Sequence, residues 1–372
     1  MTTLHLFFIQ RGKPPRGKQI YHKKTPKQMK RRLPAEWEPQ SAIQLTWPHA
    51  DTDWGYMLEE VQACYLNVAR EISKRERLII ACKNKEEVEQ QLAKLDDTCL
   101  KNISIHETDN NDTWARDHGG ITVEDEQHRY SILDFRFNGW GMKFAANKDN
   151  YITKKLHEKG AFADNVRLID HNQFVLEGGS IESDGKGTLL TTEECLLSLN
   201  RNEWMSKTEI EQYLAKAFGF DHFLWLQHGY LAGDDTDSHV DTLARLCDEQ
   251  TIAYVCCEDT KDEHYNALKA MEDELKALRD KSGNPYRLIA LPMADYAEAD
   301  GERLPATYAN FLIMNGAVLM PTYGTAKDEL AKAQLAKAFP DREIVGINCF
   351  ALIKQHGSLH CITMQYPEGV VK

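Results

Sequence analysis

Four short segments of the chain gather the residues that can do chemistry: acids, histidines, a cysteine and glycines. They are residues 111–120, 176–180, 233–241 and 356–363. A thiol nucleophile, a histidine and several carboxylates are together the groups needed to hydrolyse a planar cation, because carboxylates match the forked N–H donors of a guanidinium. The same carboxylates would repel an anionic substrate. The four segments are therefore candidates for one site that handles a cation.

The first two segments also have a purely structural explanation. In the first, Trp114, Arg116 and Asp117 precede a glycine pair, which would equally suit a turn with a surface Arg–Asp pair of small energetic value. In the second, Glu177 follows an apolar run and precedes two glycines, as in an ordinary strand-to-turn connection. Each of these segments alone is weak support for a function.

The third segment places four aspartates and one histidine within nine residues. His239 and Asp241 are two residues apart, so an extended strand would turn both to the same side. The acids suit acid–base chemistry or metal binding, but the EF-hand spacing and a second zinc-type ligand nearby are both absent. The sequence therefore favours no metal, and nothing in it calls for an organic cofactor.

The fourth segment holds Cys361 next to His360 and ahead of a polar tail. A lone cysteine near histidines is more often structural than nucleophilic. His356 and His360 could also be read as a metal pair with the cysteine, although the turn-forming Gly357 argues against a helical four-residue spacing. The segment alone does not decide between these readings.

Composition limits the classes of function. Residues 1–35 hold ten Lys or Arg and no Asp or Glu, whereas the whole chain has 45 basic and 57 acidic residues. Subtracting the ten leaves 35 basic against 57 acidic residues, or −22, for the rest of the chain. Such an acidic body disfavours nucleic acid as a partner and suits small cations, although solubility alone would also explain it. No apolar run reaches the length of a membrane span.

The chain divides into a leader and one domain. Residues 1–32 are basic with little to bury, so we expect a disordered leader followed by a single catalytic domain over residues 33–372. The nine cysteines are scattered without a C-x-x-C pair, which favours reduced thiols and a cytoplasmic location. A homo-oligomer is compatible with the sequence.

Helix and strand signals alternate from residue 44 onward. Asn315-Gly316 lies between two apolar runs and predicts a hairpin, which a helix and a strand then follow. An earlier hairpin, helix and strand repeat this order, which indicates a radially repeated α/β fold. Apolar periodicity predicts helices over residues 57–72, 86–95, 151–157, 209–218, 263–281 and 327–339, and strands over residues 121–123, 131–135, 166–169, 254–257, 311–314, 317–320 and 343–348.

The four segments, in this order, resemble the agmatine deiminase and bacterial peptidylarginine deiminase family of guanidine-modifying enzymes. The likeness runs from residue 34 to residue 367. It includes Thr46-Trp-Pro-His49, Phe137-Asn-Gly-Trp-Gly141 and the stretch 188–202 with its Asn200-Arg-Asn202. Where the family has a glycine-rich run before the cysteine, this chain has Gln355-His-Gly-Ser358, a loop expected to shape the mouth of the site.

The resemblance implies a fold and a reaction. The implied fold is a five-bladed, pseudo-symmetric α/β propeller of strand-strand-helix-strand modules with the site on its axis. The implied reaction is hydrolysis of agmatine to N-carbamoylputrescine and ammonia through a covalent amidino-cysteine intermediate, without a metal or cofactor. A peptidylarginine or free-arginine deiminase is the alternative. A cysteine amidase would not need two carboxylates around a cation, and a polyamine-binding protein would not need the thiol.

The resemblance also implies catalytic roles. Cys361 matches the nucleophile and His239 the general acid and base. Asp117 and Asp241 match the pair that clamps the guanidinium, and Glu177 matches the carboxylate that pairs with the histidine.

Two further positions match substrate contacts of the family. Trp114 would flank the substrate. Asp235 would contact it as well, and is placed to meet a terminal ammonium group.

Overall fold

The computed structural model describes residues 30–372. Almost all of the expected leader lies outside this range, and its last residues form strand β1 (Arg31–Arg32), which pairs antiparallel with β5 (Ile121–Asp125). The Arg32 guanidinium also donates to Glu38 and Glu124. The expected single domain over residues 33–372 stays a prediction.

The described chain has a mixed α/β fold built from five sheets of three or four strands and one two-stranded sheet. In each larger sheet an antiparallel pair is followed by a parallel strand. One four-stranded sheet also has β1 antiparallel to β5, and the other has β4 (Ile103–Glu107) parallel to β3 (Arg77–Cys82). The other strands are β2 (Gln40–Thr46), β3 (Arg77–Cys82), β4 (Ile103–Glu107), β6 (Tyr130–Arg136), β7 (Arg167–Val175), β8 (Glu182–Ser183), β9 (Thr188–Thr192), β10 (His222–Leu226), β11 (Ala244–Asp248), β12 (Thr251–Cys256), β13 (Arg287–Pro292), β14 (Glu298–Ala299), β15 (Glu302–Arg303), β16 (Leu312–Met314), β17 (Ala317–Thr322), β18 (Glu343–Asn348) and β19 (Thr363–Pro367).

Helices connect the parallel strands, as a parallel pair requires a long crossover. Helix α1 lies between β2 and β3, α6 between β6 and β7, α7 to α9 between β9 and β10, α10 between β12 and β13, and α11 between β17 and β18. The α-helices are α1 (Leu58–Ser73), α2 (Lys85–Leu92), α3 (Asp97–Lys101), α4 (Ala115–His118), α5 (Gly139–Met142), α6 (Ile152–Glu158), α7 (Glu193–Leu196), α8 (Leu199–Asn202), α9 (Lys207–Phe218), α10 (Tyr265–Ala277), α11 (Lys327–Ala338) and α12 (Phe350–Ile353), with short 3₁₀ helices η1 (Asp53–Met57), η2 (Asp149–Tyr151), η3 (Gly178–Ser180) and η4 (Val240–Thr242).

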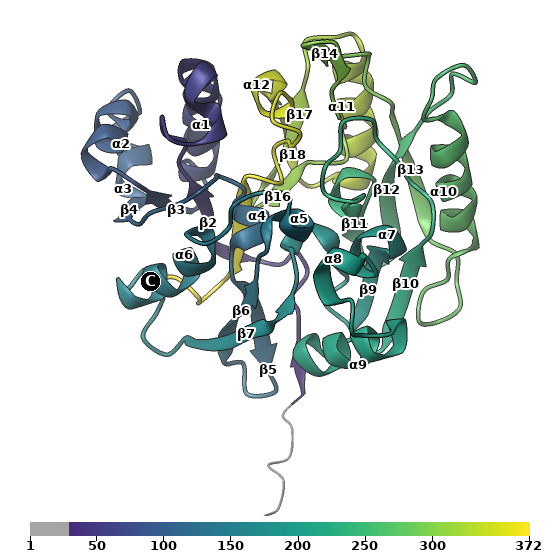
Figure 1. Cartoon of the computed structure of the whole chain (residues 1–372), viewed down its shortest axis with the longest axis horizontal. Coiled ribbons are helices and arrows are strands. Elements are labelled where there is room, and N and C mark those ends of the chain that lie inside the picture. The colour runs from purple at the N-terminus through teal and green to yellow at the C-terminus, as the bar shows by residue number, and fades with distance from the viewer. Residues whose placement is uncertain (1–29) are drawn as a thin grey trace, which may run out of the picture.

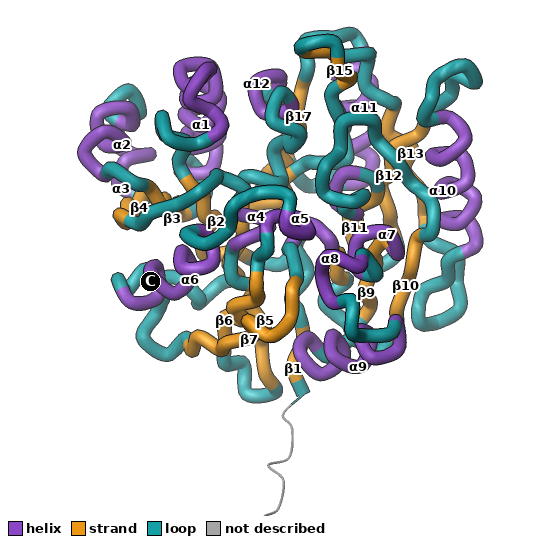
Figure 2. Tube along the Cα trace, in the orientation of Figure 1, coloured by secondary structure: helices purple, strands orange, loops and turns teal. Residues whose placement is uncertain are grey.

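The longer helices and two of the short helices occupy different places in the molecule. In Figure 1 and Figure 2, α1, α2, α9 and α10 lie around the periphery of the view, whereas the short helices α4 and α5 lie near its centre. None of the described helices combines the length and the apolar character that crossing a bilayer would demand.

Two ends of the described chain complete one sheet together. Strand β19 pairs antiparallel with β2, so that Thr363 faces Leu45, and the sheet order is β19-β2-β3-β4. Strand β19, near the end of the chain, therefore supplies the antiparallel partner of β2.

Most of the predicted elements are present. The hairpin at Asn315-Gly316 is β16–β17, and the predicted helices correspond to α1, α2, α6, α9, α10 and α11 within a few residues at their ends. Ser206 and Glu209 form a reciprocal capping box at the start of α9. All nine cysteines are free thiols, as their scattered spacing predicts.

Candidate active site

One cavity brings together the first, third and fourth polar segments, whereas residues 176–180 do not line it. Its lining includes four predicted site residues: Trp114, Asp117, Asp235 and Cys361. The Gln355–Gly357 part of the loop before the cysteine also lines it, as expected for a loop that shapes the mouth. Every one of these residues lies on a loop or a short helix rather than within a strand.

The loop between α12 and β19 presents Cys361, and Asn310 fixes that loop. Asn310 Oδ1 accepts the backbone N–H of His360 at 2.9 Å and that of Cys361 at 3.3 Å. The Cys361 thiol also donates to this oxygen at 3.3 Å. The amide of Asn310 donates in turn to the Asp241 backbone carbonyl. Asn310 therefore holds the thiol and the neighbouring acid in one arrangement.

Asp117, His239 and Asp241 meet at Gly179. A Cβ on Gly179 would lie 2.6 Å from His239 Nδ1, 2.9 Å from Asp117 Oδ1 and 3.1 Å from Asp241 Oδ2. Asp117 Oδ1 accepts the Gly179 backbone N–H and lies 3.6 Å from His239 Nδ1, while Asp117 Oδ2 accepts from Trp140 Nε1. The missing side chain at Gly179 is what allows the three groups to approach one another.

Asp241 lies directly behind the thiol, with Oδ2 at 3.9 Å from Cys361 Sγ. The same oxygen accepts from His360 Nδ1 at 2.7 Å, and His360 Nε2 lies 2.9 Å from Glu36. Oδ1 of Asp241 is buried and has no hydrogen-bond partner among the described residues. One oxygen of this carboxylate is thus held in place and the other is available to a donor.

One sequence-based expectation about this segment is wrong. Residues 239–241 do not form an extended strand: His239 precedes the 3₁₀ helix η4, which contains Asp241. The reason is local, because Thr242 Oγ1 and the Thr242 backbone N–H both bond the His239 carbonyl and so curl the chain. The two side chains still converge, since both reach Gly179.

Glu177 is buried in an ion pair rather than bonded to the histidine. Arg201 Nε contacts its two oxygens at 3.0 and 2.9 Å, and both side chains are 0% exposed. Arg201 Nη1 also donates to Asp237 Oδ2 at 2.6 Å, and Asp237 Oδ1 accepts from Lys143 Nζ. Neither ring nitrogen of His239 makes a hydrogen bond with a described residue, so Glu177 acts on the ring through charge.

Aromatic rings form part of the cavity wall. Trp114 packs against Trp54 with ring centroids 5.6 Å apart. A Cβ on Gly357 would lie 2.2 Å from the Trp114 ring, so a larger residue at Gly357 would displace the ring. Trp140 and Phe144 complete the wall.

The thiol and the histidine have pKa values shifted upward by the same surroundings. Burial raises the pKa of Cys361 well above its usual value, and the charges of Asp241 and Asp117 raise it further. Burial lowers the pKa of His239, but Asp117, Cys195 and Glu177 outweigh it and hold the pKa well above its usual value. These surroundings therefore favour a neutral thiol at Cys361 and an imidazolium at His239.

Three acids that line the cavity are hard to ionise. Burial raises the pKa of Asp117 to about 6 and that of Asp112 to about 7. It also raises the pKa of Asp235 to about 6, against the opposing effect of His356. A bound cation would relieve this cost, so the site is suited to one.

Two groups of potential metal ligands lie in this region: the buried Glu177, Cys195 and His239, and the partly exposed Glu36 with the buried Glu182 and His360. The second group is engaged by Arg245, which contacts all three side chains. The expected absence of a metal stays a prediction.

Several residues that build the site were not predicted. Asn310 carries no local chemical pattern around it. Gly179, Cys195 and Trp140 lie in the segments 176–180, 188–202 and 137–141 that stand out in the sequence, but none of the three was assigned a role. Arg201 was recognisable in the sequence, because the motif Asn200-Arg-Asn202 is part of the family resemblance, but the motif did not indicate a role for it.

Comparison with known proteins gives a consistent picture. The model of the Porphyromonas-type peptidyl-arginine deiminase family matches residues 32–367. An agmatine deiminase from Pseudomonas aeruginosa (strain UCBPP-PA14) is 34% identical over 366 residues, covering 92% of this chain and 97% of the relative.

Two solved structures are also close. A Porphyromonas gingivalis protein provisionally described as an arginine deiminase has a TM-score of 0.88 and 53% identity, covering 92% of this chain and 100% of that one. A cysteine-to-serine variant of the C. jejuni agmatine deiminase with substrate bound has a TM-score of 0.84 and 36% identity, covering 91% of this chain and 97% of that one.

Proposed function

Because the chain belongs to the Porphyromonas-type peptidyl-arginine deiminase family, we propose that it hydrolyses agmatine to N-carbamoylputrescine and ammonia. The observation that carries the proposal is the unpartnered, buried Oδ1 of Asp241, the residue whose other oxygen lies 3.9 Å from the Cys361 sulfur. A buried carboxylate oxygen without a donor is costly, and the N–H group of a guanidinium would satisfy it.

In the proposed mechanism Asp117 and Asp241 hold the guanidinium with its carbon facing Cys361. The cation lowers the pKa of the thiol that the two acids had raised, and the thiol releases its proton to solvent. The sulfur then attacks the guanidinium carbon and forms a tetrahedral adduct. The imidazolium of His239 donates its proton to one nitrogen, which leaves as ammonia, and an amidino-thioether remains.

The second half of the reaction reverses the role of the histidine. Neutral His239 accepts a proton from water as its oxygen attacks the amidino carbon. Collapse of this adduct breaks the C–S bond, releases N-carbamoylputrescine and returns Cys361. Glu177 and Asp117 stabilise the imidazolium before the first step and after the second, and the buried pair with Arg201 holds Glu177 in position.

The cavity supports agmatine over arginine. Its lining residues include Asp53, Asp112, Asp117 and Asp235 and no Lys or Arg within the described chain. The nearby Lys143 is engaged by the Asp235 backbone carbonyl at 2.5 Å and by Asp237. Asp235 is placed to meet a terminal ammonium, whereas the carboxylate of arginine would meet acids. The free-arginine alternative rests on the name of the Porphyromonas gingivalis structure.

We also propose that the five larger sheets are the blades of a pseudo-symmetric α/β propeller around the site. The recurring order of antiparallel pair, helix and parallel strand supports this arrangement. So does the joining of β19 to β2, which completes the fifth unit.

The direct test of the proposal is ammonia release. Purified protein incubated with agmatine should release ammonia and form N-carbamoylputrescine in equal amounts. A cysteine amidase would not act on agmatine, and a polyamine-binding protein would bind it without product.

The activity should fall in acid. Because the pKa of Asp117 is raised from 3.8 to about 6, this clamp carboxylate becomes protonated where an ordinary aspartate is still charged. We expect kcat/KM to fall about tenfold or more per pH unit below about pH 6, chiefly through KM. A pH profile of agmatine hydrolysis measures this. Asp164→Asn, at a highly exposed acid, should leave the profile unchanged, and a profile flat down to pH 5 would contradict the role of Asp117.

Chelation should leave the rate unchanged. The proposed reaction requires no metal, because the acids near His239 are assigned to binding the substrate. Dialysis against EDTA, followed by an assay in chelator-treated buffer, should give the same kcat as the untreated enzyme. Loss of activity that Zn²⁺ or Mn²⁺ restores would show that the mechanism is wrong.

A further inference from the structure

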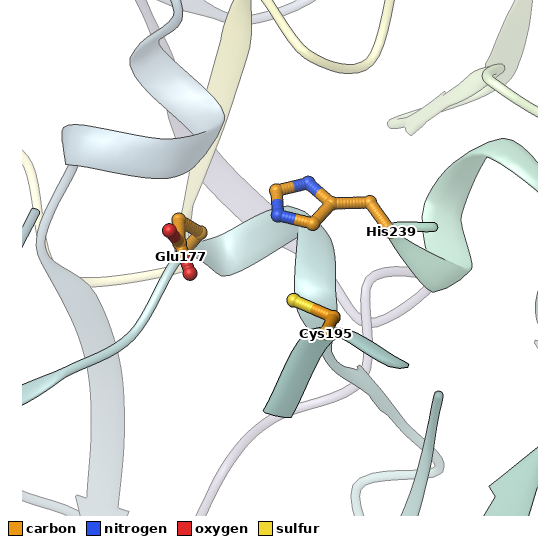
Figure 3. Close-up of side chains that lie close together, drawn as sticks. All are labelled: Glu177, Cys195 and His239. Atoms are coloured by element: carbon orange, nitrogen blue, oxygen red, sulfur yellow. The ribbon is translucent and has the colours of Figure 1, made fainter. Parts of the chain in front are cut away.

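Glu177, Cys195 and His239 come from three separate segments and converge in the interior. One ligand atom of each lies within 4.8 Å of the others, and all three residues are buried. Figure 3 shows their side chains pointing toward one another, with the His239 ring directed toward Glu177 and the Cys195 sulfur beside the ring. Thiolate, imidazole and carboxylate are the three ligand types that zinc uses in proteins.

A second observation points to a ligand in the same place. His239 is 0% exposed, and neither Nδ1 nor Nε2 has a hydrogen-bond partner among the described residues. A metal-bound histidine normally has one ring nitrogen on the metal and the other near an acceptor. Here Asp117 Oδ1 lies 3.6 Å from Nδ1, which leaves Nε2 to face a cation.

The local charge suits a dication. Glu177, Asp117 and Asp241 supply three carboxylates around His239, which the guanidinium groups of Arg201 and Arg245 offset only in part. Arg201 approaches Glu177 through Nε alone, and an ionised carboxylate has about four lone-pair directions. One side of Glu177 therefore remains open to a metal.

We propose that Glu177, Cys195 and His239 form a binding site for a thiophilic divalent cation, with Zn²⁺ the best match, and that the bound ion inhibits the enzyme. Binding displaces the proton of the Cys195 thiol and that of the imidazolium to solvent, and three protein bonds to the metal form. His239 can then neither donate nor accept a proton. The binding stands on the geometry, whereas the inhibition rests on the proposed function of His239.

The site is separate from the nucleophile, which gives a sharp experiment. Metal-free full-length protein is titrated with Co²⁺ as a spectroscopic probe and with Zn²⁺ by calorimetry. Native protein and Cys361→Ser should bind one equivalent and show a thiolate-to-cobalt charge-transfer band. Cys195→Ser should lose the band and bind Zn²⁺ about 100-fold or more weakly. Cys247→Ser, at another buried cysteine, is the matched control and should bind normally.

Activity gives the second readout. Zn²⁺ should inhibit native enzyme at one equivalent, EDTA should reverse the inhibition, and Cys195→Ser should be resistant relative to its own zinc-free rate. If Cys195→Ser does not fold, His239→Asn read by the cobalt band serves instead and should also lose it. A band that survives in Cys195→Ser or disappears in Cys361→Ser overturns the proposal, as does absence of binding. If the protein binds Co²⁺ but does not turn over agmatine in the absence of zinc, the proposed function would be overturned and the metal site would stand.

Discussion

Replacing Cys361 with alanine should abolish agmatine turnover, with kcat reduced by about 10⁴-fold or more, while the protein still binds the substrate. The thiol forms the covalent bond, and no other cysteine lines the cavity in the described chain. Binding should persist because Asp117 and Asp241 make the ionic contacts. Single-turnover kinetics and calorimetry with agmatine measure the two effects separately.

The appropriate control is another buried cysteine. Cys82→Ala removes a thiol from the core of β3 and should lower stability without comparable loss of kcat. Mass spectrometry of enzyme quenched during turnover should find an added amidino group on the peptide that contains Cys361. An adduct on Cys195 instead would transfer the nucleophilic role to that residue.

Agmatine should be preferred over free arginine by about 10³-fold or more in kcat/KM. The two substrates share the guanidinium and differ at the far end, where arginine adds a carboxylate. That carboxylate would be buried unpaired beside Asp235 and Asp112, which already have raised pKa values because of their burial. The measurement is the ratio of catalytic efficiencies for agmatine, arginine and a blocked arginine peptide.

A substitution at the far end of the cavity sharpens this comparison. Asp235→Asn keeps the shape of the side chain and removes its charge, so it should reduce the preference for agmatine while the guanidinium contacts remain. Asp221→Asn, at an exposed acid, should leave the ratio unchanged. If arginine equalled or exceeded agmatine in the native enzyme, the substrate would be wrong and the deiminase chemistry would stand.

The sequence predicted those features that follow from local rules. Apolar periodicity located α1 and α10, and Asn315-Gly316 located a hairpin, because these depend on neighbours along the chain. The polar segments that line the cavity were also recognisable, because each gathers chemically reactive residues, such as Cys361 or Asp117, within a few positions of glycines. Their assignment to particular roles came from resemblance and stays a proposal.

The contacts that shape the site could not be predicted in this way. Asn310 orients Cys361 from 51 residues earlier in the chain, and Arg201 neutralises Glu177 from 24 residues later. Neither pairing leaves a spacing rule in the sequence. An extended strand was considered for residues 239–241, because a spacing of two residues does not reveal the Thr242 hydroxyl that bonds the His239 carbonyl and curls the chain.

The pairing of β19 with β2 sets an order of events during synthesis. Gln44 and Tyr366, which bond across this pair, are 322 residues apart. A ribosome adding about 5–20 residues per second separates their emergence by roughly 15 to 65 seconds. Through that interval β2 lacks its antiparallel neighbour, and an open strand edge is a template for wrong pairing. Cys361 emerges just ahead of β19, after the acids and histidine assigned to the site. The nascent chain thus acquires its thiol nucleophile at nearly the same moment as it covers its open edge.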